Sequence, residues 1–281
     1  MTSAHHGSGD GRDELRNLAR TLAREAGDFA LTMRRAGVDV AGQKSSAVDI
    51  VTKADQATEQ LIRERLQALR PSDGVLGEEG SSVAGTSGLT WVVDPIDGTV
   101  NYLYGIPAWG VSIAVVEGDP DPATWTALAG AVANPSTGDV FSAARGLGAT
   151  CNERPLAVSI PTDLAMSLVA TGFAYSSEVR AHQGEMMHTI LPRVRDIRRF
   201  GACSLDLCAL ADGRVDGFFE QTLSPWDHAA GALIAREAGA VISGFPGDRE
   251  SRGLLVAATP GIHEELLALV VEAGAGQLPG L

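Results

Sequence analysis

The chain has 281 residues, of which 44% are hydrophobic and 20% are charged. This composition excludes general disorder, and the length allows a sizeable core. The 22 basic and 35 acidic residues give a formal net charge of −13, which argues against direct binding of nucleic acid or of an anionic membrane. No apolar run approaches the roughly 18 residues of a membrane span, and the three cysteines lack the spacing of a disulfide framework or a zinc site. We expect a soluble cytoplasmic protein.

Two amphipathic helices are predicted in the first 70 residues. Apolar side chains recur at helical spacing over residues 13–35, and Gly37 ends the run. Residues 56–69 repeat the pattern, with Glu59 and Arg63 placed to pair on the outer side. Each helix is expected to pack on the core through one face. The core-facing residues expected are Leu15, Leu18, Ala19, Leu22, Ala26, Phe29, Ala30 and Met33, then Leu61, Ile62, Leu66 and Leu69.

The middle and the end of the chain differ in their strand pattern. Short β-rich runs such as GVSIAVV, separated by turn residues, fill residues 90–160 and indicate a largely antiparallel sheet. After about residue 160 strands and helices alternate, which favours α/β layering. We expect an N-terminal α+β half, residues 1–147, and a C-terminal α/β half, residues 148–281, within one compact unit.

A basic cluster, RVRDIRR at 193–199, is interrupted by Asp196 and by apolar residues. This pattern is typical of a solvated helix end and strand start, and we do not interpret it as a polyanion site.

The stretch WVVDPIDGTVNY at 91–102 runs an apolar strand into two aspartates, Asp94 and Asp97. Side chains at the carboxyl end of a strand lie where sites on open sheets commonly form. Gly98 permits an unusual backbone angle, and if Gly98 and Thr99 open a turn or a short helix, their N–H groups favour a phosphate. The alternative is a polar turn in which Asp97 caps a helix.

Two further segments place acids at element ends. VLGEEG at 75–80 ends a strand at Glu78 and Glu79, and SPWDHAAGALIAREAGA at 224–240 places Asp227 in the first turn of an apolar helix. An aspartate there is often only a helix cap. However, none of these acids has a lysine or arginine beside it, and carboxylate oxygens without histidine or cysteine select Mg²⁺ or Mn²⁺ over zinc. The three segments together predict a site for divalent metal, with more than one ion.

The order GEE, DPIDGT, then WD ahead of AAGALIAREAGA resembles the inositol monophosphatase family of Mg²⁺-dependent, lithium-sensitive phosphatases. The resemblance runs from KSSAVDIVTKAD at 44–55 to the last predicted helix, and the motifs agree in order, spacing and residue type. It implies the layered αβαβα sandwich of the sugar phosphatases, usually assembled as a homodimer.

The resemblance also implies two or three bound Mg²⁺ ions, with Mn²⁺ as a substitute. Glu78 and Thr99 would orient the attacking water, and Lys44 and Asp55 match an outer shell that supports a third, weaker metal position. The implied metal ligands are the side chains of Glu78, Asp94, Asp97 and Asp227 and the main-chain carbonyl of Ile96.

Both ends of a phosphate monoester have implied contacts. The phosphate would meet the main-chain N–H groups of Gly98 and Thr99, beside Ile96, Asp97 and Asp227. The segment RRFGACSLDLCALADGRVDGFFE at 198–220 resembles the family's substrate segment. It has Cys203 where many relatives have alanine, a change of little consequence because contact there is through the backbone. The implied alcohol contacts are the backbone of Gly201, Ala202 and Cys203 and the carboxylate of Glu220.

The resulting hypothesis is a Mg²⁺-dependent phosphomonoesterase that hydrolyses inositol 1-phosphate or a related polyol phosphate by direct in-line attack of water. The alternatives within the family are histidinol-phosphate phosphatase, fructose 1,6-bisphosphatase and adenosine 3′,5′-bisphosphate phosphatase. A second phosphate calls for extra basic residues, and EQTLSPWDH at 220–228 carries none, which favours a neutral, hydroxyl-rich alcohol. The alternative of another class is a regulatory protein that acts through a protein partner.

Overall fold

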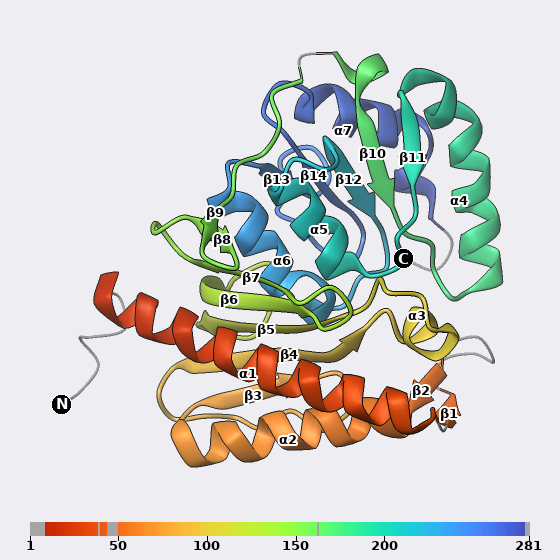
Figure 1. The fold of residues 1–281 in the computed structure, drawn as a ribbon. Helices are drawn as coiled ribbons and strands as arrows, with labels where there is room; N and C mark the ends of the chain where they lie inside the picture. The colour runs from red at the N-terminus through yellow and green to blue at the C-terminus, as the bar shows by residue number, and fades with distance from the viewer. Residues whose placement is uncertain (1–8, 39, 44–49, 162, 279–281) are drawn as a thin grey trace.

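Five layers of helix and sheet stack on one another in the computed structural model, which describes residues 9–38, 40–43, 50–161 and 163–278 (Figure 1). Helices α1 and α2 form the first layer, a seven-stranded sheet the second, α5 and α6 the third, a five-stranded sheet the fourth, and α4 and α7 the fifth. The predicted αβαβα sandwich is confirmed. The helices are α1 (Gly9–Ala36), α2 (Lys53–Leu69), α3 (Thr99–Tyr104), α4 (Ser177–Ile190), α5 (Cys203–Ala211), α6 (Pro225–Glu237) and α7 (His263–Glu272).

The first sheet has the strand order β3-β4-β5-β6-β7-β8-β9 and is antiparallel except for the β3–β4 pair, as the sequence predicts. The register of β4 on β5 shifts between Asp94 and Asp97, where Pro95 lacks the N–H that a ladder needs. The shift leaves Pro95 and Ile96 outside the regular register, between Asp94 opposite Ser112 and Asp97 opposite Gly110. The strands are β3 (Gly74–Gly77), β4 (Leu89–Asp97), β5 (Gly110–Glu117), β6 (Thr126–Asn134), β7 (Asp139–Ala144), β8 (Ala149–Cys151) and β9 (Arg154–Pro155).

The second sheet has the order β11-β10-β12-β14-β13. β10 runs parallel to β11 and β12, whereas β14 is antiparallel to β12 and β13, so the predicted alternation of strands and helices gives a mixed sheet. Its strands are β10 (Leu168–Thr171), β11 (Asp196–Arg198), β12 (Gly217–Glu220), β13 (Val241–Ser243) and β14 (Leu255–Ala258). The remaining elements are the antiparallel pair β1 (Val40–Gln43) and β2 (Ile50–Thr52) and the 3₁₀ turns η1 (Leu164–Met166), η2 (Leu191–Arg193) and η3 (Ala275–Gln277).

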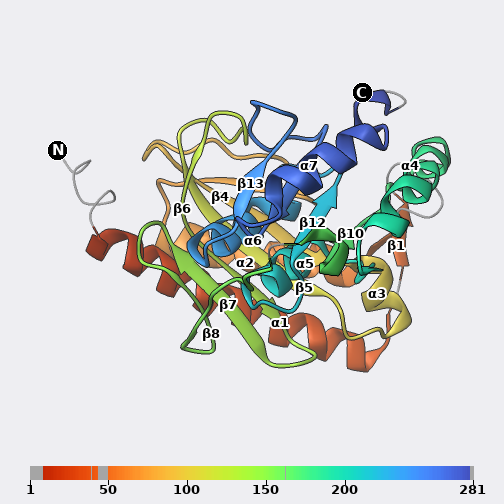
Figure 2. The ribbon, with the colours of Figure 1, turned by 90° about the horizontal axis from the view of Figure 1, so that it is seen from above.

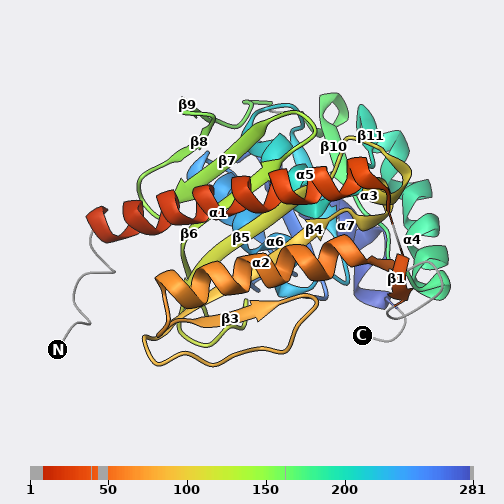
Figure 3. The ribbon, with the colours of Figure 1, turned by 60° about the horizontal axis from the view of Figure 1, so that its bottom comes forward.

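Helices α1 and α2 lie side by side across the outer face of the first sheet (Figure 3). Small residues on α1, such as Ala19 and Ala26, are fully or almost fully buried and let the helix approach the sheet closely. The prediction was wrong for Phe29, which is 37% exposed at the edge of this alanine stripe, and for Leu69, which is 57% exposed at the last residue of α2. The other predicted core positions that are buried are Leu15, Leu22, Ala30, Ile62 and Leu66.

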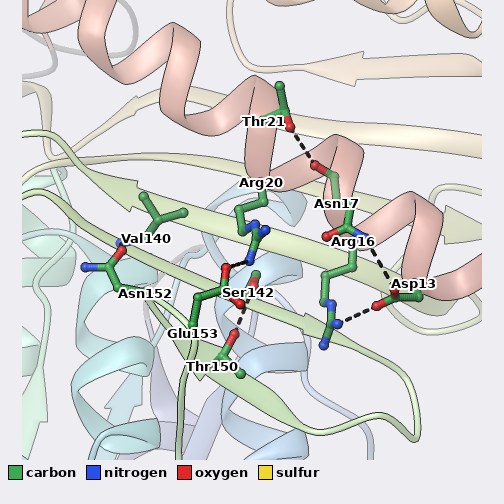
Figure 4. Close-up of polar contacts among 10 residues, drawn as sticks. All are labelled: Asp13, Arg16, Asn17, Arg20, Thr21, Val140, Ser142, Thr150, Asn152 and Glu153. Carbon is green, nitrogen blue, oxygen red and sulfur yellow. Dashed lines mark hydrogen bonds and ion pairs between the residues drawn. The ribbon is translucent and has the colours of Figure 1, made fainter.

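A surface ion pair ties α1 to the far edge of the first sheet (Figure 4). Arg20 Nη1 donates to Glu153 Oε1 at 2.5 Å. Glu153 and Asn152 form the two-residue turn between β8 and β9, with φ values of 71° and 45°, the geometry of a type I′ hairpin. Because the Glu153 side chain is 78% exposed, the pair is worth at most about 1 kcal/mol.

The middle layer is packed by alanine and glycine, which bring α6 close to both of its neighbours (Figure 2). A Cβ at Gly231 would lie 2.9 Å from Leu207 on α5, and one at Gly130 of β6 would lie 3.2 Å from Ala230. Close packing thereby fixes α6, whose first turn carries Asp227, against β4 and β5. Among the residues described, no helix is both long and apolar enough to cross a membrane.

Candidate active site

One cavity of about 500 Å³ receives the carboxyl ends of β3 and β4 and the first turn of α6. Glu78, Asp94, Asp97 and Asp227 all line it. These are the four side chains predicted as metal ligands, and the fold brings them together from three separate segments. The volume lies in the range of small-molecule sites.

Backbone N–H groups orient two of the four carboxylates. Ile96 N–H donates to Asp94 Oδ1 at 3.1 Å, and Ser224 N–H donates to Asp227 Oδ2 at 2.6 Å. The second bond is half of a capping box, so Asp227 does serve as a helix cap, the alternative role that its position suggested. Capping and lining the cavity are compatible because one carboxylate has two oxygens.

Asp97 is held by a residue that sequence reasoning missed. Its Oδ2 accepts the backbone N–H of Ser204 at 2.7 Å and the Ser204 hydroxyl at 2.5 Å. Ser204 lies in the first turn of α5, 107 positions further along the chain. The only signal in the sequence was a hydroxyl at the start of an apolar helix, and nothing there connected it with Asp97.

Burial and mutual repulsion together set the electrostatics of these carboxylates. Burial, then Glu78, Asp97 and Asp227, hold the pKa of Asp94 well above its ordinary value. Burial, then Glu78, Asp97 and Glu220, raise the pKa of Asp227, and burial raises that of Asp97 to about 6 despite the opposing bonds from Ser204. Within the described ranges, no lysine or arginine forms an ion pair with any of these three aspartates. The cluster therefore favours a bound cation.

The donor set fits a hard divalent ion, although the side chains do not enclose one as they stand. No three histidine, cysteine, aspartate or glutamate side chains of the described residues are arranged as a ready metal cage. Glu78 lies close enough to Asp94 to raise the pKa of its carboxyl group. An ion bound between these side chains would meet carboxylate oxygens, the ligands that Mg²⁺ and Mn²⁺ prefer.

The loop that carries Glu78 is fastened to α2 by a buried glutamate. Glu59 accepts the backbone N–H of Glu79 at 2.7 Å and that of Gly80 at 2.8 Å, and Arg63 Nε donates to it at 2.7 Å. The predicted Glu59–Arg63 pair exists, but its placement on the outer side was wrong: Glu59 is 2% exposed because the loop after β3 folds over it.

Gly98 turns the chain from β4 into the short helix α3, as predicted. Its φ is +88°, a left-handed conformation that residues with a Cβ rarely adopt. A Cβ there would also lie 3.1 Å from Ala202 and from the carbonyl oxygen of Gly201. The backbone at Gly98 and Thr99 thus lies directly against the predicted substrate segment, on the wall of the same cavity.

Thr99 is oriented by Asp55, which was predicted in an outer shell. The Thr99 hydroxyl lies 3.1 Å from Asp55 Oδ1 and 3.1 Å from the Ile96 carbonyl oxygen, and it donates its one proton to either. Thr52 N–H holds the other oxygen of the buried Asp55 at 2.8 Å. Lys44, predicted beside Asp55, lies outside the described residues.

The four predicted alcohol contacts line the same cavity, on a part of its wall that we call the alcohol end: Gly201, Ala202, Cys203 and Glu220. The backbone N–H of Ala202 is held by the buried carboxyl group of Asp206, a residue outside the predicted site. Burial raises the pKa of Glu220 to about 8, although the nearby Arg199 lowers it.

The charged residues of the RVRDIRR segment are exposed, as predicted, but the last of them also lines the cavity. Arg198 does point away and pairs with Asp196 at 2.7 Å. Arg199, in contrast, lines the cavity, as does Arg252 from the loop between β13 and β14. Neither arginine was predicted in the site, because each is distant in sequence from every acidic motif.

Comparison with known proteins matches the family model described as "Inositol monophosphatase family" to residues 12–275. The chain belongs to this family. It is 45% identical to the inositol-1-monophosphatase of Mycobacterium leprae, over 91% of this chain and 93% of that protein. It is 38% identical to the Nus factor SuhB of Pasteurella multocida, with coverages of 89% and 93%. The solved structure of Mycobacterium tuberculosis SuhB superimposes with a TM-score of 0.79 at 42% identity, covering 94% of this chain and 98% of that one.

Membership of the inositol monophosphatase family confirms the resemblance seen in the motifs and the prediction that the chain is a phosphoric monoester hydrolase. The family is generally metal dependent, in agreement with the charge of the cavity.

Proposed function

We propose that this protein is a Mg²⁺-dependent phosphomonoesterase that converts inositol 1-phosphate, or a related polyol phosphate, to the free alcohol and phosphate. The observation that carries the proposal is the shared cavity, which is lined by four carboxylates, by the glycine-threonine backbone and by the Glu220 segment. A phosphate ester in this cavity would meet all three.

The metal would be held by the carboxylates of Glu78, Asp94, Asp97 and Asp227, with the carbonyl oxygen of Ile96 at the cavity wall. When bound, divalent ions supply a lowered pKa for water and neutralise charge on the phosphoryl group. We propose two or three Mg²⁺ ions, which Mn²⁺ would replace, because the charge of four carboxylates in one cavity exceeds the charge of one divalent ion.

Thr99 and Glu78 would orient the attacking water. Since the Thr99 hydroxyl donates to Asp55 or to the Ile96 carbonyl, its oxygen lone pairs are left to accept a hydrogen bond from water. Glu78 would accept the second hydrogen of that water. Asp55 acts as a positioning residue for Thr99.

The substrate would be held at both ends. The N–H groups of Gly98 and Thr99 would donate to the phosphate, and the left-handed turn at Gly98 keeps side-chain bulk out of this contact. At the alcohol end, the Gly201–Cys203 backbone and Glu220 would meet the hydroxyl groups. The side chains in the predicted set include no free nucleophile, so water attacks the phosphorus in line and no phosphoenzyme forms.

The test is phosphate release from inositol 1-phosphate, histidinol phosphate, fructose 1,6-bisphosphate and adenosine 3′,5′-bisphosphate, each with Mg²⁺ and with a chelator. We expect Mg²⁺-dependent turnover of the polyol phosphates. A strong preference for histidinol phosphate or the nucleotide would replace the substrate class, and metal-independent turnover would contradict the proposal.

We also propose a cytoplasmic homodimer, which the family resemblance implies; light scattering on a size-exclusion column measures the mass. A regulatory role through a protein partner is a second candidate, because one relative is named Nus factor SuhB. Affinity purification of the chain and of Asp94→Asn, followed by mass spectrometry, tests it: the second role predicts the same stoichiometric partner with both forms.

A further inference from the structure

Two arginines line the alcohol end of an otherwise acidic cavity, and the proposed reaction uses neither. Arg199 follows β11, and Arg252 belongs to the loop between β13 and β14. Both side chains are exposed. An arginine at the wall of a substrate cavity is a ready donor for phosphate or carboxylate oxygens.

The backbone around Arg252 is fixed to the cavity wall from both sides. Thr222 N–H donates to the Arg252 carbonyl oxygen at 2.7 Å, and Gln221 Nε2 donates to the carbonyl oxygen of Gly253 at 3.1 Å. Thr222 and Gln221 directly follow Glu220 at the end of β12. Arg252 therefore starts from a defined position next to the segment that meets the alcohol.

Thr222 holds this position in a strained conformation. Its φ is +68°, in the left-handed region, which a β-branched residue adopts at a cost of roughly 1–3 kcal/mol. Strain of this kind persists where surrounding contacts enforce it, and it is common at ligand sites. Here the enforced contact is the bond between Thr222 and the backbone of Arg252.

The Arg252 side chain itself is left for a ligand. In the part of the chain that the structure describes, no hydrogen bond or ion pair engages its guanidinium group. The guanidinium group of Arg199 lies over Gly201, where a Cβ would be 2.2 Å from Nη1, and its charge acts on Glu220. Two acids, Glu220 and Asp206, lie close enough to Arg199 for its charge to lower their pKa values, and Arg252 brings a second positive charge to the same cavity.

We infer that Arg252, assisted by Arg199, forms a second anion subsite, and that the site prefers polyol phosphates carrying a second phosphate across the ring from the one that is cleaved. This inference rests on the proposed function. The scissile phosphate would lie against Gly98 and Thr99 with the proposed metal ligands, and the second phosphate would meet the guanidinium group of Arg252, which lines the same cavity. A neutral alcohol would leave that group without a partner.

The experiment compares two substrates that differ by one phosphate, myo-inositol 1-phosphate and myo-inositol 1,4-bisphosphate, with full-length protein and Mg²⁺. Arg252→Met removes the charge and keeps most of the length of the side chain. Arg252→Lys keeps the charge but lacks the planar guanidinium group that can donate two parallel hydrogen bonds. Arg24→Met, an exposed residue of α1 away from the cavity, is the control with the same change in net charge.

We expect wild type to favour the bisphosphate in kcat/KM. Arg252→Met should lower that value for the bisphosphate about ten- to a hundredfold, the worth of a charge-assisted bond, with the loss in KM. The monoester should change less than about threefold, Arg252→Lys should recover part of the loss, and Arg24→Met should match wild type. Thermal melting of each variant shows whether it is folded.

Two outcomes distinguish a failure of the proposed function from a failure of the second anion subsite. If wild type with Mg²⁺ hydrolyses neither ester, the proposed function fails. If it hydrolyses the monoester but Arg252→Met leaves the ratio of the two kcat/KM values unchanged, the function stands and the second anion subsite is refuted.

Discussion

The two ends of the cavity are built in different ways. At the phosphate end, Asp94 and Asp97 are buried, and backbone N–H groups and Ser204 fix the three aspartates. At the alcohol end, Glu220 ends β12, Arg199 and Arg252 lie in the segments that follow β11 and β13, and both arginines are exposed. This difference suggests the hypothesis that the phosphate end determines which reaction occurs, and that the alcohol end, which consists largely of loop residues, determines which substrate binds.

The largest expected effect comes from neutralising the phosphate end. Asp94→Asn should lower kcat/KM by at least about 10²–10³-fold, because a metal ligand at the centre of the cluster is lost. Without metal, the same variant should melt no lower than wild type, since it removes one of several charges that repel one another. Phosphate release and calorimetry in chelator measure the two effects. A variant that loses stability along with activity would argue that Asp94 is structural.

Removing the support of one ligand should have an intermediate effect. Ser204→Ala deletes the hydroxyl that donates to Asp97 Oδ2 while keeping the N–H, and we expect about a ten- to a hundredfold loss of Mg²⁺ affinity. Isothermal titration with Mg²⁺ measures it directly. Ser159→Ala, whose hydroxyl bonds Asp216 outside the cavity, is the matched control. Equal Mg²⁺ affinities in the two variants would remove Ser204 from the metal site.

The pH dependence of stability should also distinguish the metal-free and loaded forms. Burial raises the pKa of Asp97 from 3.8 to about 6, so its protonated form is favoured in the folded state. The resulting contribution is complete below pH 3.8 and is lost as the pH rises through about 6. With Glu220, whose pKa is raised from 4.5 to about 8, the metal-free protein should lose on the order of 2–5 kcal/mol between pH 4 and pH 8. Mg²⁺ should recover much of this loss at pH 8; a metal-free melting temperature that rises over this range would contradict the assignment.

The smallest effect is expected far from both ends. Glu153→Gln breaks the exposed pair with Arg20 and should cost less than about 1 kcal/mol of unfolding free energy. Activity should be unchanged at every substrate concentration. This variant measures how far the loss of one surface charge alone changes the free energy of unfolding and the activity.

The layered fold and the four acidic residues of the cavity could be predicted from sequence because each acid lies in a local pattern: the end of a strand or the start of a helix, with a turn residue within a few positions. Ser204 and Arg252 could not, since they reach the cavity through contacts over long stretches of chain. Glu59 was misplaced for a related reason: its spacing to Arg63 shows a pair, but not the loop that folds over it. Phe29 was predicted to be buried because it is apolar. The buried face of α1 instead consists largely of alanine, because the helix lies very close to the sheet.

The bond between Asp97 and Ser204 spans 107 positions and joins the end of β4 to the start of α5. Contacts of such long sequence separation carry a loop-closure cost and form late in folding. We therefore expect Asp97 to be fixed in place only after α5 has packed against the first sheet. A metal ion added to a refolding chain should consequently slow unfolding while leaving the refolding rate nearly unchanged.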